Sequence, residues 1–173
     1  MKLLIISHTE HFKNGNGEIV GWGPTLTEIN FLATVFDEIY HLAVFKNVKA
    51  PPSALPYTSD RIHFVPLKAT GGEQLYQKLD IVWQPPATIF KVFQLLKKVD
   101  VFQLRTPTGI GVYLIPILTL FSKKNGWYKY AGNWVQLNAP FGYDLQRWFL
   151  KNQKRKVTIN GKWDDQQKQF YTF

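Results

Sequence analysis

Polar residues that could do chemistry follow several predicted strands of this chain, each at the strand's carboxyl end. His8 follows the first predicted strand, and Arg105 follows a later one. An imidazole can serve as a general base, and a guanidinium gives two parallel hydrogen bonds to a phosphate or carboxylate. We therefore interpret His8 and Arg105 as candidate catalytic residues. The alternatives are a polar strand cap for His8 and an ion pair with a nearby acid for Arg105.

Glycines are concentrated between residues 14 and 24, a segment that we predict to be a loop. Gly21, Trp22 and Gly23 stand before a predicted helix, where glycines permit close backbone approach and the helix amino terminus favours an anion. The segment does not match the dinucleotide-binding fingerprint, because it has one residue too many before its last glycine and the helix begins only after Pro24. A Walker-type phosphate loop is also absent. The pattern disfavours the usual NAD and ATP sites, and a plain flexible loop remains an alternative.

The chain gives little support for a metal or thiol site. His8 and His11 flank Thr9-Glu10, but they follow a strand directly and lack a convincing third ligand, so we expect no metal. His41 and His63 fall inside predicted strands, where histidines are more often structural. The chain has no cysteine, which excludes thiol catalysis, thiolate metal sites and disulfides and favours a reducing compartment. We expect a cytoplasmic protein.

Strand-like and helix-like segments alternate along the chain. A capping box at Thr25–Glu28 predicts a helix start, and Ile29, Leu32, Val35 and Phe36 would form its inward stripe. Pro85 and Pro86 would begin a longer helix, and the proline-rich stretch before residue 57 would be irregular. The predicted strands cover residues 3–7, 39–45, 61–67, 101–104, 127–131 and 157–159; the other predicted helices cover 73–79, 85–99, 109–121 and 143–153.

This alternation predicts the fold class. Parallel strands need crossover connections, and those connections bury both faces of a sheet. We therefore expect an α/β fold with a doubly wound, mostly parallel sheet and helices on both faces, in one Rossmann-like domain over residues 1–173. Ligands of such sheets bind beyond the strand carboxyl ends. This rule also selects Thr106, Asn133 and Trp134 as candidate substrate-binding residues.

The positive charge is concentrated late in the sequence. The formal net charge is +9, and residues 101–163 hold ten lysines and arginines against the single Asp144. Such an asymmetry favours an anionic membrane surface, nucleic acid or an acidic ligand, although a solvated surface would also account for it. The uncharged run Thr106–Ser122 falls just short of a membrane span, and we expect a buried or membrane-grazing helix there. No secretory signal is visible.

Four segments in order carry a family resemblance. They are the Lys-Leu-Leu-Ile-Ile-Ser opening, Gly21–Thr25 with Glu28 in the following helix, Asp100–Pro107, and Tyr130-Ala131-Gly132-Asn133-Trp134. Together, over residues 1–160, they resemble the amino-terminal half of GT-B glycosyltransferases. More narrowly, the chain is similar to the family-four-like sugar transferases of bacterial polysaccharide assembly.

This resemblance implies an activity and its substrates. Such enzymes have two Rossmann-like domains, of which the amino-terminal one binds a saccharide or lipid-linked acceptor and the carboxy-terminal one binds a nucleotide-sugar. The donor diphosphate would contact Gly21, Trp22 and Gly23. The reaction would need no metal and no cofactor besides the nucleotide-sugar substrate. Because the acceptors are commonly lipid-linked, the resemblance also favours a peripheral position at the inner membrane face.

The chain departs from the family pattern in two ways. A histidine often found after the fifth strand is absent, and Gly132-Asn133-Trp134 stands in its place. The carboxy-terminal donor domain, with its pair of glutamates, is missing. We therefore expect either a fragment or a subunit whose donor domain is a separate chain, catalytically inactive alone.

Two other classes of function remain open. A basic, aromatic-rich domain could bind single-stranded nucleic acid by stacking, but most aromatic residues fall on predicted buried faces and no nucleic-acid motif is present. A stand-alone assembly or regulatory α/β domain would need no small-molecule site. Salt-sensitive oligonucleotide binding would favour the former, and a surface without a strand-end cleft the latter.

Overall fold

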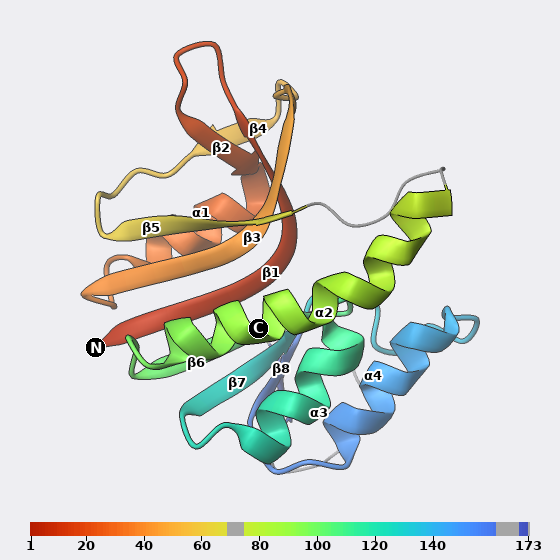
Figure 1. Cartoon of the computed structure of the whole chain (residues 1–173). Helices are drawn as coiled ribbons and strands as arrows, with labels where there is room; N and C mark the ends of the chain where they lie inside the picture. Colours follow the sequence, from red (N-terminus) through yellow and green to blue (C-terminus); the bar gives the residue numbers. More distant parts are fainter. Residues whose placement is uncertain (69–74, 162–169, 173) are drawn as a thin grey trace. The chain divides into compact units, whose positions relative to one another are not determined.

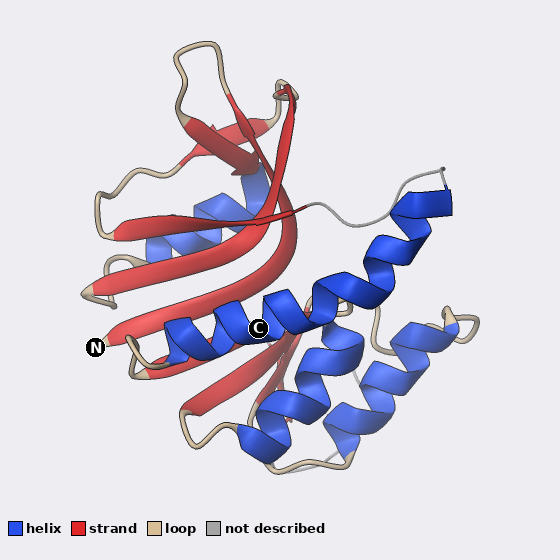
Figure 2. Ribbon diagram, in the orientation of Figure 1, coloured by secondary structure: helices blue, strands red, loops and turns tan. Residues whose placement is uncertain are grey.

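The computed structural model describes residues 1–68, 75–161 and 170–172, with side chains of α2 described from Pro85 onward. The chain groups into two compact units, Met1–Asp100 and Val101–Phe173 (Figure 1). Strands alternate with helices in both units (Figure 2). The chain is therefore an α/β protein with mostly parallel strand pairing. The expectation of a single Rossmann-like domain stays a prediction.

The first unit contains a mixed arrangement of five described strands in the order β4-β2-β1-β3-β5. Strands β1, β3 and β5 are parallel neighbours, and β2 runs antiparallel to both β1 and β4. The elements are β1 (Lys2–Lys13), β2 (Ile19–Trp22), α1 (Gly23–Leu32), β3 (Glu38–Lys49), β4 (Ala54–Pro56), β5 (Ile62–Lys68) and α2 (Leu75–Leu96).

The second unit pairs all of its described strands in parallel, in the order β6-β7-β8-β9. The Tyr128 hydroxyl bonds Thr119 Oγ1 at 2.7 Å and donates to the Ile115 carbonyl at 3.2 Å, so α3 covers the sheet face that carries Tyr128. The elements are β6 (Val101–Thr106), α3 (Gly111–Phe121), β7 (Asn125–Tyr130), α4 (Phe141–Lys151), β8 (Val157–Ile159) and β9 (Phe170–Thr172).

The predicted first strand is confirmed and is longer than expected. Leu3, Leu4, Ile5 and Ile6 are all fully buried. Successive strand side chains point to opposite faces, so both faces of β1 are covered here, which explains the continuous aliphatic run. Full burial of each such side chain contributes roughly 2 kcal/mol. Beyond Ser7 the strand continues to Lys13.

The prediction of a loop over residues 14–24 is wrong for most of its length. Strand β2 pairs antiparallel with the end of β1, and only the residues between the two strands form a turn. The Asn14 side-chain oxygen accepts from the amides of Asn16 and Glu18 at 3.0 and 2.9 Å, and Gly17 adopts a φ of 81°. The asparagine and the left-handed glycine therefore build a hairpin turn.

The predicted capping box is also wrong. Helix α1 starts at Gly23 without a side-chain cap, and Thr25 is buried within its first turns. Pro24 occupies the first turn, where a fixed φ suits the helix and no amide donor is needed. The helix ends at Leu32, so Val35 lies beyond it and is 64% exposed instead of facing inward.

Prolines account for the other corrections to the predicted elements. Pro85 and Pro86 lie inside α2, because the fixed φ of proline remains compatible with a helix at the cost of amide donors. Strand β4 ends at Pro56, and it lies at the edge of its sheet, where proline is tolerated. Strand β9 was not predicted, and the expected helix start at residues 73–74 lies outside the described residues.

None of the described helices is both long and apolar enough to cross a bilayer. The uncharged run around α3 forms a helix with Leu114, Ile115 and Leu118 fully buried. Leu120 and Phe121, at the end of the same helix, are 74% and 69% exposed. The run therefore forms a packed helix with an exposed apolar end.

Candidate functional site

The carboxyl edge of β6 and β7 brings several predicted site residues together. Arg105 and Thr106, at the end of β6, pair with Lys129 and Tyr130 of β7. Beyond the strands, the Ala131 amide donates to the Thr106 carbonyl at 2.7 Å. This bond brings the segment after β7 beside the end of β6, at the edge where α/β sheets bind ligands.

The loop between β6 and α3 is held from α4 by a buried glutamine. Gln146 Oε1 accepts from the Thr108 amide at 3.1 Å, and its Nε2 donates to the Gly142 carbonyl at 2.8 Å. A Cβ on Gly111 would lie only 2.1 Å from Gln146 Oε1. The glycine is therefore needed for close packing, and the glutamine satisfies the amide donor of Thr108 just before α3.

The segment after β7 forms one wall of a pocket. Trp134 is buried, with its ring edge-on to Tyr130 at 4.9 Å and the Lys151 ammonium 5.7 Å from the indole centroid. Arg147 donates to the backbone carbonyls of Trp134 and Gln136 and pairs with the Asp144 carboxylate. These contacts fix the segment beside a pocket of about 490 Å³.

Two indoles and several polar groups line this pocket. Trp148 is 57% exposed, so that much of its indole is open to solvent, while Trp134 forms the buried side. Gln136, Asp144 and Lys151 supply amide, carboxylate and ammonium groups. Aromatic surfaces with nearby hydrogen-bonding groups are suited to a ligand that has apolar C–H faces and hydroxyl edges.

Arg105, Thr106 and Asn133 are held by their surroundings. Arg105 and Thr106 are buried, and the Thr106 hydroxyl donates to the Lys129 carbonyl at 3.4 Å. The Asn133 side-chain oxygen accepts from the Val135 amide at 3.2 Å. The Asn133 side chain therefore stabilises the turn that follows β7.

The predicted glycine site of the first unit lies at the junction of β2 and α1. A Cβ on Gly21 would lie 2.7 Å from the His11 ring, and one on Gly23 would lie 2.9 Å from the Ser53 carbonyl oxygen. Close packing is thus a sufficient reason for glycine at both positions. Trp22, between them, is 57% exposed.

His8 lies on β1 where the pairing with β3 shifts register, between Ile6 and Glu10. Burial is the main cause that lowers the pKa of the half-buried His8 imidazole below its usual value. Glu10 raises this pKa and forms an ion pair with Lys46, which lowers it. His8 is therefore neutral near pH 7 and can accept a proton.

The first unit also contains a buried polar cluster that was not predicted from the sequence. The Ser7 hydroxyl bonds His41 Nε2 at 2.8 Å, and His41 Nδ1 bonds the Tyr57 hydroxyl at 2.7 Å. Tyr57 also bonds His11 Nε2 at 2.8 Å, and His11 Nδ1 bonds the Thr9 carbonyl at 3.0 Å. Ser7, His11 and His41 are buried. Their spacing in the sequence carries no motif, because β1, β3 and the proline-rich segment supply the members.

If each imidazole carries one ring proton, the direction of every bond in this cluster follows from the Thr9 carbonyl. The Thr9 oxygen only accepts, so His11 Nδ1 donates and its Nε2 accepts from Tyr57. Tyr57 then accepts from His41 Nδ1, and His41 Nε2 accepts from Ser7. The Thr9 amide donates to the Ser7 oxygen at 3.3 Å, which closes the ring at the residue where it began.

Burial decides what this ring can do. It lowers the pKa of His11 to about 4 and raises the pKa of the Tyr57 hydroxyl. Ser7 donates to an imidazole that is oriented from its other side, as a serine nucleophile would, but its residue is only 1% exposed. A substrate therefore has no access to the hydroxyl, and the ring stabilises the packing of β1 against β3.

The predicted site residues fall into two groups. His8, Gly21, Trp22 and Gly23 belong to the first unit, and within it His11, not His8, faces Gly21. Arg105, Thr106, Asn133 and Trp134 belong to the second unit and lie at one sheet edge. In the described part of the chain, no three His, Asp or Glu side chains are grouped closely enough to hold a metal ion.

A scan against protein-family models finds no match to this chain, and a search of curated proteins finds no relative. The family resemblance therefore rests on the four sequence segments that carry it.

Proposed function

We propose that this chain is the acceptor-binding, Rossmann-like half of a GT-B glycosyltransferase. The reaction would move a sugar from a nucleotide-sugar to a saccharide or lipid-linked acceptor of bacterial polysaccharide assembly. A further domain would hold most of the donor. The protein would work in the cytoplasm, peripherally at an anionic inner membrane face. Four ordered segments that resemble this family support the proposal.

One observation carries the proposal furthest. The pocket of about 490 Å³ beside the carboxyl end of β7 combines two indoles with amide, carboxylate and ammonium groups. Its volume lies in the range of ligand sites, and its edge of the sheet is the one where α/β domains bind ligands. A sugar ring has apolar faces for Trp148 and hydroxyl groups for Gln136 and Asp144.

The chemical roles follow from the groups at each strand end. His8, neutral near pH 7 because burial lowers its pKa, would accept the proton of the acceptor hydroxyl. Arg105 would stabilise negative charge that develops on the leaving diphosphate. By the family resemblance, Gly21, Trp22 and Gly23 of the first unit would contact the nucleotide-sugar donor. Thr106, Asn133 and Trp134 would shape the acceptor side.

Saccharide binding by the chain tests the proposal. A panel of bacterial oligosaccharides is titrated into the wild-type chain and into Trp148→Ala, with Phe121→Ala as the control. Phe121 is also an exposed aromatic residue, but it does not line the pocket. We expect millimolar or tighter binding of at least one oligosaccharide, weakened about tenfold in Trp148→Ala only. No binding, or equal losses in both variants, would contradict an acceptor site in this pocket.

A further inference from the structure

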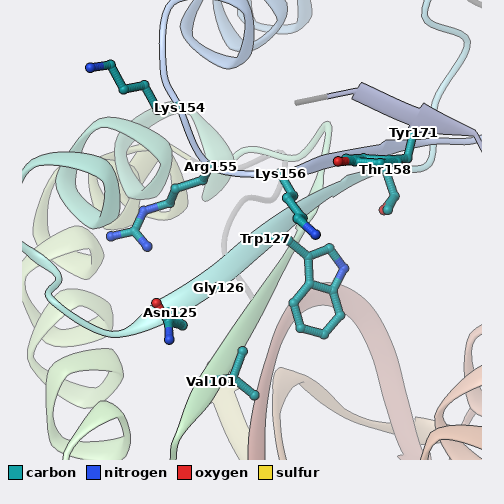
Figure 3. Close-up of a pocket in the computed structure, with 9 residues that line it drawn as sticks. All are labelled: Val101, Asn125, Gly126, Trp127, Lys154, Arg155, Lys156, Thr158 and Tyr171. Carbon is teal, nitrogen blue, oxygen red and sulfur yellow. The ribbon is translucent and has the colours of Figure 1, made fainter. Parts of the chain in front are cut away.

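A larger pocket, of about 690 Å³, lies at the opposite edge of the sheet in the second unit (Figure 3). Its lining includes Val101 and Trp127, near the beginnings of β6 and β7, together with Thr158 of β8 and Tyr171 of β9. Parallel strands begin at the same edge, so this pocket is separate from the proposed acceptor site at the carboxyl edge.

The register places the lining side chains on one face of the sheet. Trp127 lies two residues before Lys129, which pairs with Thr158, and Thr158 pairs with Tyr171. Paired and alternate residues of parallel strands share a face. Tyr128, which contacts α3, points to the opposite face. Trp127, Thr158 and Tyr171 therefore lie on the face away from α3, as Figure 3 shows for their side chains.

Arg155 fixes the loop that enters this pocket. Its guanidinium donates to the carbonyls of Lys124 and Ser122 at 2.8 and 2.6 Å and to that of Leu118 at 3.3 Å. The same group lies 5.3 Å from the Phe102 ring centroid, on the α3 side of the sheet. In Figure 3 it points away from Trp127. Arg155 is thus a positioning residue that ties the loop to the end of α3.

Lys154 and Arg155 also line the pocket but extend away from Trp127 in Figure 3, so the neighbouring Lys156 supplies the charge beside the aromatic rings. Its ammonium lies 5.3 Å from the Tyr171 ring centroid and extends toward Trp127 in Figure 3. Thr158 and Asn125 add a hydroxyl and an amide. No carboxylate is found among the described residues that line the pocket. The site therefore offers a cation, neutral hydrogen-bonding groups and two aromatic rings to one ligand.

We propose that this pocket binds a phosphate monoester carried on a flat aromatic body, as in a nucleoside monophosphate. The phosphate contacts the Lys156 ammonium and the Thr158 hydroxyl, and the ring lies against Trp127. A compact ammonium binds phosphate as a point charge, and a base stacks on an aromatic side chain. The pocket volume is within the range of small-molecule sites.

Four probes separate the possible sources of binding. Adenosine monophosphate, adenosine, inorganic phosphate and an unphosphorylated single-stranded octanucleotide are each titrated into the wild-type chain at low salt. We expect the monophosphate to bind at least about tenfold more tightly than adenosine or phosphate alone, because both contacts are then made together. Tighter binding of the octanucleotide would overturn the proposal and indicate a nucleic-acid surface. No binding of the monophosphate at millimolar concentration would also overturn it.

Matched variants locate the site. Lys156→Gln removes the charge from an exposed position, so it should leave folding intact and weaken monophosphate binding about tenfold. Lys123→Gln is the control, because Lys123 is exposed in the neighbouring loop and does not line the pocket. Trp127→Phe keeps a ring and should reduce the ligand-induced fluorescence change. Equal affinity in Lys156→Gln and Lys123→Gln would rule out this pocket.

Discussion

The two units of the chain handle polar groups in different ways. Met1–Asp100 contains all four histidines and balances ten lysines and arginines against nine acids. Val101–Phe173 contains no histidine and holds eleven lysines and arginines against three acids. The first unit encloses its polar cluster in a hydrogen-bonded ring, whereas the second places cations beside pockets at its sheet edges. We therefore expect pH to act on the first unit and salt and anions on the second.

Removal of one member of the buried ring should give the largest loss of stability. His41→Ala leaves a cavity and removes the partner of both Ser7 and Tyr57. We expect a loss of about 4 kcal/mol in the free energy of unfolding, measured by urea denaturation. His63→Ala is the control, because that side chain is 45% exposed and should cost under about 1 kcal/mol. Similar losses in the two variants would show that the ring does not stabilise the first unit.

Acid should destabilise the chain through His11. Its pKa is about 4 when folded against a usual value of 6.5, so between these values the unfolded state binds more protons. Stability must then fall as the pH falls from about 6.5 toward 4, by about 3 kcal/mol in total. His8, whose pKa is also lowered, adds to the same slope. Urea denaturation at several pH values measures this dependence.

The matched substitutions separate titration from packing. His11→Gln lowers stability at every pH but should flatten the dependence between pH 4 and 6.5. His63→Gln should leave the slope as it is in the wild-type chain. An unchanged slope in His11→Gln would show that another group controls the acid response.

A glycine pair tests the carboxyl edge of the second unit. Gly111→Ala would place a Cβ 2.1 Å from Gln146 Oε1 and displace the side chain that holds the Thr108 amide. We expect a loss of about 2 kcal/mol in the free energy of unfolding. Gly109→Ala, in the same loop, meets no atom within 4 Å and should be close to neutral. Equal stabilities would mean that Gln146 does not hold this loop.

Apolar patterning predicted much of the fold. The apolar run at the start of the chain was predicted as a buried strand, which the structure confirms, and the strand over residues 157–159 was predicted with its observed ends. The wrong predictions involve residue types that are common in more than one kind of structure, such as glycine, which occurs both in loops and at close packing contacts. The glycines around Gly21 indicated a loop, but at Gly21 the reason is contact with His11 across a strand pair.

The candidate sites were harder to predict because long-range contacts form them. Arg105 and Asn133 were selected by the strand-end rule, and their edge is formed as expected within the second unit. The ring of Ser7, His41, Tyr57 and His11 depends on the register between β1 and β3, and no local pattern specifies that register. The larger pocket depends likewise on β9, which was not predicted.

The smallest predicted effect concerns the cations of the second unit on an anionic membrane. The basic residues between 101 and 163 do not all contribute, because Arg147 is occupied by loop carbonyls and the Asp144 carboxylate. The bond from Arg155 to the Lys124 carbonyl brings two basic loops together beside the exposed Phe121. The patch is therefore smaller and lies at the end of α3.

Vesicle co-sedimentation at two ionic strengths measures its strength. Each lysine near an anionic leaflet contributes about 1 kcal/mol at best, and salt screens it. Replacing both Lys123 and Lys154 by glutamine should thus reduce pelleting with anionic vesicles by roughly tenfold at low salt and less at high salt. The same change at Lys13 and Lys97, which are exposed in the first unit, should leave pelleting unchanged. If both double variants lose binding equally, net charge and not this patch drives the association. That result would contradict the expectation that anionic membranes act on the second unit and not on the first.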